Sequence, residues 1–153
     1  MATDKRYVET LRVPLAWWLL GGLFGLAVGW AFYVATPVSW AIAATAVGLA
    51  TAFVILWRYG SAVVVVDDVG LTAGKAHLPW QHLGSVTPLD EGAARRAAGV
   101  EADARAFAVL RAYCRGAVKV GVVDDADPTP YWLVSTRRPD ELARHLSART
   151  VQD

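Results

Sequence analysis

Two adjacent arginines, Arg137 and Arg138, form the basic feature of this sequence with the clearest chemical meaning. Guanidinium groups bind phosphate and carboxylate oxygens through paired hydrogen bonds, which makes the pair a candidate site for a lipid headgroup or an acidic partner. The alternative is that one arginine pairs with Asp140 or Glu141 while the other is solvated. Lipid-binding clusters usually hold about 4–8 basic residues, and this argument favours the alternative.

Arg111 and Arg115 would join the pair if the fold brings them close. Tyr131 and Trp132 precede the arginines in a segment that reads as a strand, so their side chains should face opposite sides. We expect one ring in the core. The other, with Trp132 as the candidate, would be exposed to a partner or to a membrane surface.

The residue types that perform catalysis are sparse. Cys114 is the single cysteine, and a small core residue in a reducing compartment is its simplest interpretation. Nucleotide-binding and hydrolase motifs are missing, and the histidines lack the spacing of metal ligands. We therefore expect no catalytic residue, no metal and no cofactor, and a non-enzymatic protein.

An acidic cluster, Asp124, Asp125 and Asp127, lies between two strands and beside two prolines. A calcium loop would need an extended alternation of oxygen ligands and a distant glutamate, which this stretch does not contain. A solvated turn whose aspartates accept backbone hydrogen bonds is favoured instead.

The 15 basic and 14 acidic residues give a net charge of +1, which argues against a nucleic-acid-binding surface. The stretch from Val13 to Trp57 contains no charged residue at all. Since a bilayer core takes about 20 apolar residues per helix, this stretch predicts two membrane-spanning helices, at about 14–35 and 40–57. A signal peptide would be shorter, so we expect both helices to be retained.

Small residues recur every four positions in both predicted helices, which places each set on one helix face. The sets are Gly21, Gly25 and Gly29 in the first helix, and Ala44, Gly48 and Ala52 in the second. The short turn favours packing of the two faces against each other, and a homo-oligomer through the glycine face is the alternative. The absence of ionisable residues argues against an ion or proton pathway.

Basic residues flank both outer ends of the hairpin, whereas the turn at 36–39 has no charge. By the positive-inside rule we expect both termini in the cytoplasm and the protein in the plasma membrane. We divide the chain into residues 1–59, a short cytoplasmic lead plus the hairpin, and residues 60–153, a soluble domain.

The soluble domain reads as a series of short strands, at 62–66, 71–73, 76–80, 86–89, 117–123 and 131–136. Residues 90–106 are rich in alanine and charge and are expected to form a loop, with at most a helical turn. Residues 107–114 favour a strand over a helix. A final amphipathic helix begins at Pro139, with acidic residues in its first turn.

This order of elements resembles a pleckstrin-homology-like (PH-like) domain, a small antiparallel β-barrel or sandwich capped by a C-terminal helix. The tracts GLTAGKAHLPWQHLGSV and DPTPYWLVSTRRPDELARHL, together with the hairpin, resemble an uncharacterised actinobacterial family of small two-helix membrane proteins, a domain-of-unknown-function family. The resemblance implies an α+β membrane protein and no known activity.

We therefore expect a membrane-anchored scaffold or interaction module whose partners are the lipid bilayer and membrane-associated proteins. Binding of anionic lipid or of a lipid-linked ligand is the second hypothesis. A membrane-surface enzyme is the third.

Overall fold

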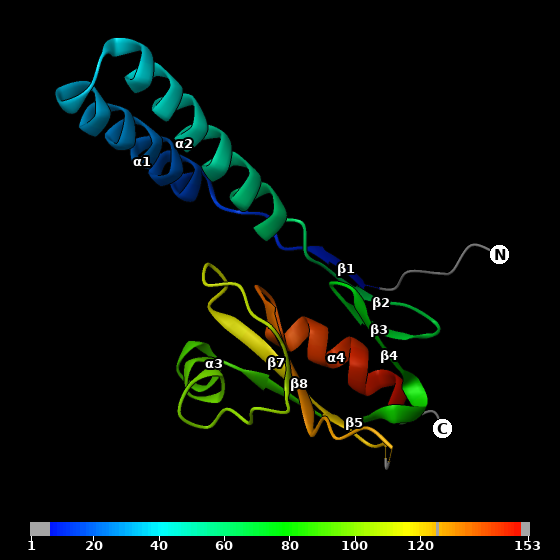
Figure 1. Cartoon of the computed structure of the whole chain (residues 1–153). Helices are drawn as coiled ribbons and strands as arrows, with labels where there is room; N and C mark the ends of the chain where they lie inside the picture. The colour runs from blue at the N-terminus through cyan, green and yellow to red at the C-terminus, as the bar shows by residue number, and fades with distance from the viewer. Residues whose placement is uncertain (1–6, 125, 151–153) are drawn as a thin grey trace. The chain divides into compact units, whose positions relative to one another are not determined.

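The computed structural model describes residues 7–124 and 126–150 and has an α+β architecture (Figure 1). The chain divides into two compact units. One is the stretch 12–61, and the other combines the described residues before Arg12 with those after Ser61.

The stretch 12–61 is a helical hairpin made of α1, Leu15–Ala35, and α2, Val38–Tyr59. Pro37 separates the helices, and both the N–H and the hydroxyl of Thr36 donate to the Phe32 carbonyl at 2.8 Å. The prediction placed the start of the second helix near residue 40. It begins at Val38 instead, because the fixed φ of Pro37 lets the helix start directly after it.

The glycine face of α1 packs against α2 within the chain. A Cβ added at Gly21 would lie 3.4 Å from the Ala52 Cβ, and one added at Gly48 would lie 3.3 Å from the Gly25 Cα. A Cβ at Gly29 would overlap Thr45. The predicted contact is therefore present for Gly21 with Ala52 and for Gly25 with Gly48, whereas the atoms nearest to Gly29 belong to Thr45 and not to Ala44. On this face α1 already packs against α2, the face that the alternative reserved for a second copy.

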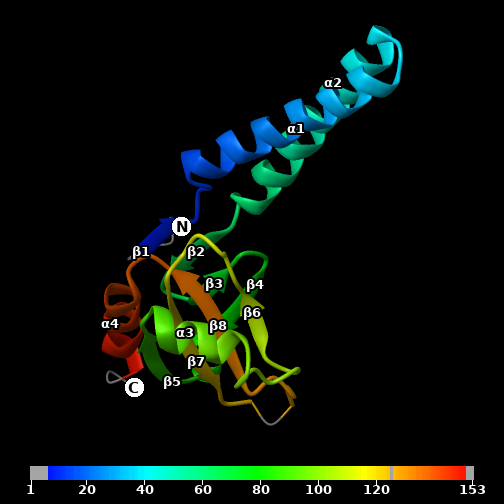
Figure 2. The same ribbon diagram turned by 90° about the vertical axis from the view of Figure 1, so that its left-hand side faces the viewer.

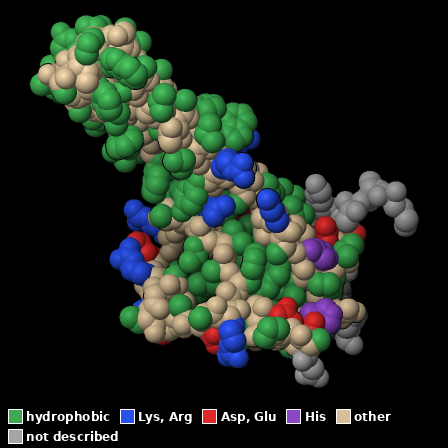
Figure 3. Space-filling model, viewed as in Figure 1, with side chains coloured by type: hydrophobic (Ala, Val, Ile, Leu, Met, Phe, Trp, Pro, Cys, Tyr) green, Lys and Arg blue, Asp and Glu red, His purple; other side chains and the backbone are tan. Residues whose placement is uncertain are grey.

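The rest of the hairpin surface is apolar and exposed. Only 11% of the most apolar 18-residue window of each helix is buried, and both helices are long and apolar enough to cross a membrane. Figure 3 shows hydrophobic side chains covering the visible face of the hairpin. A core helix of a soluble protein would instead be mostly buried.

Sheet A of the second unit contains a strand from each side of the hairpin. Its order is β1 (Tyr7–Thr10), β2 (Val63–Val66), β3 (Gly70–Ala73) and β4 (Ala76–Pro79), all antiparallel. Beyond the pairs of β1 and β2, the N–H of Leu11 donates to the Ala62 carbonyl at 3.0 Å. The sequence grouped residues 1–12 with the hairpin, but residues 7–11 belong to the unit that contains the two sheets.

Sheet B has the order β5 (Leu83–Leu89), β7 (Gly116–Val122), β8 (Tyr131–Thr136) and β6 (Phe107–Val109). Its pairs are antiparallel except β6 with β8, which run parallel. The two sheets do not close into a barrel, so the unit is sandwich-like. The predicted strands and the C-terminal helix are confirmed.

Two helices cover opposite faces of sheet B, as Figures 1 and 2 show. The C-terminal helix α4, Pro139–Thr150, contributes Leu142, Ala143 and Leu146 to the main core, which includes residues of both sheets. The other helix, α3, spans Glu91–Ala98 and packs its alanines over the outer face.

The presence of α3 corrects the expected loop at 90–106. Asp90 caps this helix by accepting a 2.8 Å hydrogen bond from the Ala93 N–H, and Glu91 in the first turn suits the helix dipole. Of residues 107–114, only Phe107–Val109 form a strand.

Candidate functional site

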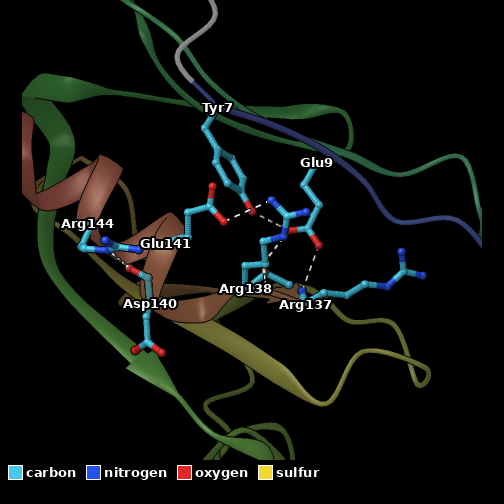
Figure 4. Close-up of polar contacts among 8 residues, drawn as sticks. Tyr7, Glu9, Arg137, Arg138, Asp140, Glu141 and Arg144 are labelled. Carbon is cyan, nitrogen blue, oxygen red and sulfur yellow. Dashed lines mark hydrogen bonds and ion pairs between the residues drawn. The ribbon is translucent and has the colours of Figure 1, made fainter.

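The arginines singled out by the sequence lie where β8 ends and α4 begins, and a carboxylate from β1 reaches this junction (Figure 4). Glu9 Oε1 accepts a 2.9 Å hydrogen bond from the Arg137 N–H. Glu9 Oε2 accepts from the Tyr7 hydroxyl at 2.8 Å and from the hydroxyl of the fully buried Thr136. One carboxylate therefore accepts from three donors, which lie on β1, on β8 and in the β8–α4 connection.

Arg138 is engaged on both its main chain and its side chain. Its N–H donates to Thr136 Oγ1 at 3.0 Å, and its guanidinium Nη1 lies 3.2 Å from Glu141 Oε2 on the first turn of α4. This is the pairing that the sequence offered as the alternative to an anion site. Both side chains are solvent-accessible, so the pair adds little to stability.

Arg137 and Arg111 lie around the same half-buried cysteine. The Arg137 guanidinium is 5.9 Å from the centroid of the Tyr113 ring, and the Arg111 N–H donates to Ser135 Oγ at 3.0 Å. Burial raises the pKa of Cys114, although the positive charges of Arg137 and Arg111 act in the opposite direction. A thiol with a raised pKa is a poor nucleophile, which fits the packing role expected of it.

Two of the predicted binding residues lie elsewhere. Arg115 is exposed, and its Nη1 lies 3.8 Å from Oε2 of Glu91 on α3. Trp132 is only 6% exposed and packs on Phe107 with ring centroids 4.5 Å apart. The prediction that one of Tyr131 and Trp132 is exposed was wrong, because both faces of β8 are covered and both rings are buried.

A cavity of about 220 Å³ lies at the junction, lined by Tyr7, Val8, Glu9, Thr10, Arg137 and Arg138. Burial, with a contribution from the Glu9 carboxylate, raises the pKa of Tyr7 to about 12, so its hydroxyl remains a donor. Glu9 occupies the position that an external anion would take on the Arg137 N–H. We interpret the junction as an internal clamp between β1 and the β8–α4 connection.

The sequence did not identify Glu9 and Tyr7 as members of this site. The signal was the short alternation in YVET, where Tyr7 and Glu9 share one strand face. Two of the groups that Glu9 binds, Thr136 and Arg137, follow the hairpin in the sequence. The residues around Glu9 therefore gave no indication of these hydrogen bonds.

The acidic turn is capped by its own aspartates. Asp124 Oδ1 accepts from the Ala126 N–H, and Asp127 Oδ1 accepts from the Thr129 N–H, both at 2.9 Å. The hydrogen bonds from Thr129 lower the pKa of Asp127. Asp125 lies outside the described residues, and within the described ones no three potential metal ligands cluster.

A comparison with known protein families finds a match that covers most of the chain. Residues 6–146 match the family described as "Protein of unknown function (DUF3093)". The chain belongs to this family. The matched residues run from β1 through the hairpin and both sheets into α4, so the match covers both units of the chain.

Membership confirms the resemblance to an uncharacterised family of unknown function. The actinobacterial origin and the PH-like architecture remain predictions. No curated protein and no solved structure matches this chain. The function must therefore be argued from the geometry.

Proposed function

We propose that this protein is an integral protein of the plasma membrane, anchored by α1 and α2. The α+β unit would be a non-enzymatic scaffold or interaction module at the cytoplasmic face. The observation that carries the anchor is the exposed apolar surface of two helices of 21 and 22 residues. At about 1.5 Å per residue each helix matches a hydrocarbon core of about 30 Å.

The pairing of β1 with β2 supports retention of the hairpin. Removal of α1 as a signal peptide would also remove β1, which supplies an edge strand of sheet A and the clamp residue Glu9. The same pairing requires both ends of the hairpin to emerge on one side of a membrane, because Leu11 and Ala62 are hydrogen-bonded to each other.

The orientation rests on the flanking charges. Arg12 and Arg58 flank the apolar stretch, while the turn between α1 and α2 carries no charge. Positively charged ends remain on the cytoplasmic side by the positive-inside rule, which supports a cytoplasmic α+β unit.

Labelling of engineered cysteines tests this topology after Cys114 is replaced by serine. Ser39→Cys in the first turn of α2, beside the turn between the helices, and Ala148→Cys on α4 both place a thiol at an exposed position. We expect an impermeant reagent to label Ser39→Cys in intact cells and Ala148→Cys only after permeabilisation. The reverse pattern, or labelling of both in intact cells, would overturn the orientation.

A non-enzymatic role is supported by the engagement of the polar groups at the junction, where the Thr136 hydroxyl donates to Glu9 and accepts from the Arg138 N–H. Crosslinking in native membranes, followed by mild solubilisation, tests the scaffold proposal. A protein that always purifies alone as a monomer would contradict it.

Anionic-lipid binding is the competing function, and the cavity beside Arg137 and Arg138 is the observation that favours it. The purified full-length protein should then retain anionic lipid, and the Arg137→Gln/Arg138→Gln double variant should lose it. Equal retention by both proteins would exclude this role for the arginines.

A further inference from the structure

The outer face of sheet B is divided into an apolar half and a polar half. Leu89, Ala117 and Leu133 lie in the apolar half and are packed under the alanines of α3. The polar half carries Thr87 and Lys119, which are direct cross-strand partners of β5 and β7. Only the first half is sealed by the helix.

A cavity of about 510 Å³ lies between this polar half and α3. Its wall on the sheet includes Ser85, Thr87, Lys119, Gly121 and Tyr131, and its wall on the helix includes Ala93 and Ala97. The volume is within the range of small-molecule sites, about 300–1,000 Å³. All of these residues belong to the α+β unit.

Small residues keep this space open. The side of α3 that lines the cavity presents Ala93 and Ala97, whose side chains are single methyl groups. On β7, a Cβ added at Gly121 would lie 3.0 Å from Ser85 Oγ, so glycine leaves that hydroxyl accessible. The alanine-rich composition of α3 thus produces a cavity where larger side chains would have filled the sheet face.

Lys119 supplies the positive charge in the cavity wall. This charge has no ionic partner among the described residues. Its Nζ lies 4.1 Å from the centroid of the Tyr131 ring, and no described carboxylate lies within ion-pair distance of it. The wall also contains the carboxylate of Glu101. Its Oε1 lies 3.5 Å from Arg96 Nε, so its negative charge is paired with that arginine.

The ring below the lysine is held in place. The Tyr131 hydroxyl accepts a 3.0 Å hydrogen bond from the Asp103 N–H, and the ring is buried under α3. Lys119 is therefore supported on a fixed aromatic surface, with the hydroxyls of Ser85 and Thr87 on the same wall.

We propose that this cavity binds a small molecule carrying a phosphate or carboxylate group, with Lys119 as its ionic contact. Ser85 and Thr87 would donate hydrogen bonds to the same anion, as an ammonium and hydroxyl groups do in other anion sites. The interaction module would then be a sensor whose partner binding depends on a ligand. Binding here requires neither the membrane anchor nor the cytoplasmic orientation, so the two proposals fail independently.

Calorimetric titration of the full-length protein in phosphatidylcholine nanodiscs tests the site, with inorganic phosphate, glycerol 3-phosphate and succinate as probes. We expect at least one probe to bind, and Lys119→Met to weaken it at least about tenfold. Lys75→Met is the matched control, because Lys75 is exposed on the β3–β4 turn, and it should bind as the wild type does.

A second pair of variants tests the cavity itself. Ala93→Leu should fill the space and abolish binding, whereas Ala98→Leu, exposed on the same helix, should leave it unchanged. Thermal unfolding confirms that each variant is folded. Absence of binding of every probe to the wild type, or unchanged binding by both Lys119→Met and Ala93→Leu, would overturn the proposal.

The source of the anion is distinguished by adding phosphatidylglycerol to the nanodiscs. If a lipid headgroup is the natural ligand, the free probe should bind more weakly to the wild type in these nanodiscs. Unchanged binding assigns the site to a free small molecule.

Discussion

The Arg137 N–H donates a 2.9 Å hydrogen bond to the Glu9 carboxylate across 128 residues of sequence. The contact joins a strand that precedes the hairpin to the connection that follows the last strand. Because the same carboxylate accepts from Tyr7 and Thr136, the segment before the hairpin is an integral part of the α+β unit.

Replacement of Glu9 should therefore destabilise the fold. Glu9→Ala leaves the buried Thr136 hydroxyl and the Arg137 N–H without this acceptor, at a cost of about 1–3 kcal/mol. Denaturant unfolding of the full-length protein in detergent measures the change. Glu101→Ala is the control, since its only described ion pair is exposed, and it should change stability by less than about 0.5 kcal/mol. Equal effects of the two variants would contradict the clamp.

The α+β unit should fold without the hairpin, provided that β1 is kept. Joining Leu11 to Ala62 through Asn-Gly would convert β1 and β2 into a hairpin with a two-residue turn, because these residues already form a hydrogen-bonded pair. We expect a soluble, cooperatively unfolding monomer, measured by light scattering and thermal denaturation.

The matched control is the fragment 60–153, which corresponds to the soluble domain expected from the sequence. It lacks an edge strand and Glu9, so it should be less stable than the joined protein or aggregate. A fragment as stable as the joined protein would show that β1 contributes nothing.

Two glycines of α1 should respond differently to the same substitution. Gly25→Val would place a Cβ 2.8 Å from Leu49 Cγ and 3.1 Å from its backbone nitrogen, whereas a Cβ at Gly22 meets nothing within 4 Å. Overpacking should cost Gly25→Val about 1–3 kcal/mol of hairpin stability, and Gly22→Val should cost less. The two variants are compared by energy transfer between labels on α1 and α2 in increasing amounts of a denaturing detergent. The loss of energy transfer reports separation of the helices.

Stability should fall at high pH through Tyr7. The phenol has its ordinary pKa of 10.0 when unfolded and a pKa of about 12 when folded. Since the folded state holds the proton more tightly, this contribution is complete below about pH 10 and is lost between about pH 10 and pH 12, amounting to about 2–3 kcal/mol.

Tyr7→Phe removes the titrating group and should flatten this part of the pH profile, although it also loses the hydrogen bond to Glu9 at every pH. The free energy of unfolding is measured for both proteins between about pH 8 and pH 11.5. Profiles of equal slope would show that the Tyr7 proton is not coupled to folding.

Much of the local structure could be predicted because it depends on neighbouring residues. The charge-free stretch predicts two apolar helices, and the small residues at four-residue spacing predict the contact of Gly21 with Ala52. Alternating valines predict β7, and Pro139 with its acidic neighbours predicts the start of α4.

The site was predicted only in part, because its members come from distant segments. Arg111 does lie near Arg137 around Cys114, but Arg115 pairs with α3 and Trp132 is buried. A strand pattern shows that two adjacent side chains face opposite ways. It does not show that both faces of the strand are covered.

The apolar hairpin, most strands and the terminal helix can thus be predicted from the order of residues, since each follows from local periodicity and turn chemistry. Three relationships became visible only in the folded chain: β1 pairs with β2 across the hairpin, Glu9 binds the Arg137 N–H, and α3 leaves Lys119 in the wall of a cavity. These relationships depend on strand pairing and side-chain packing between residues far apart in the chain, which no local pattern specifies.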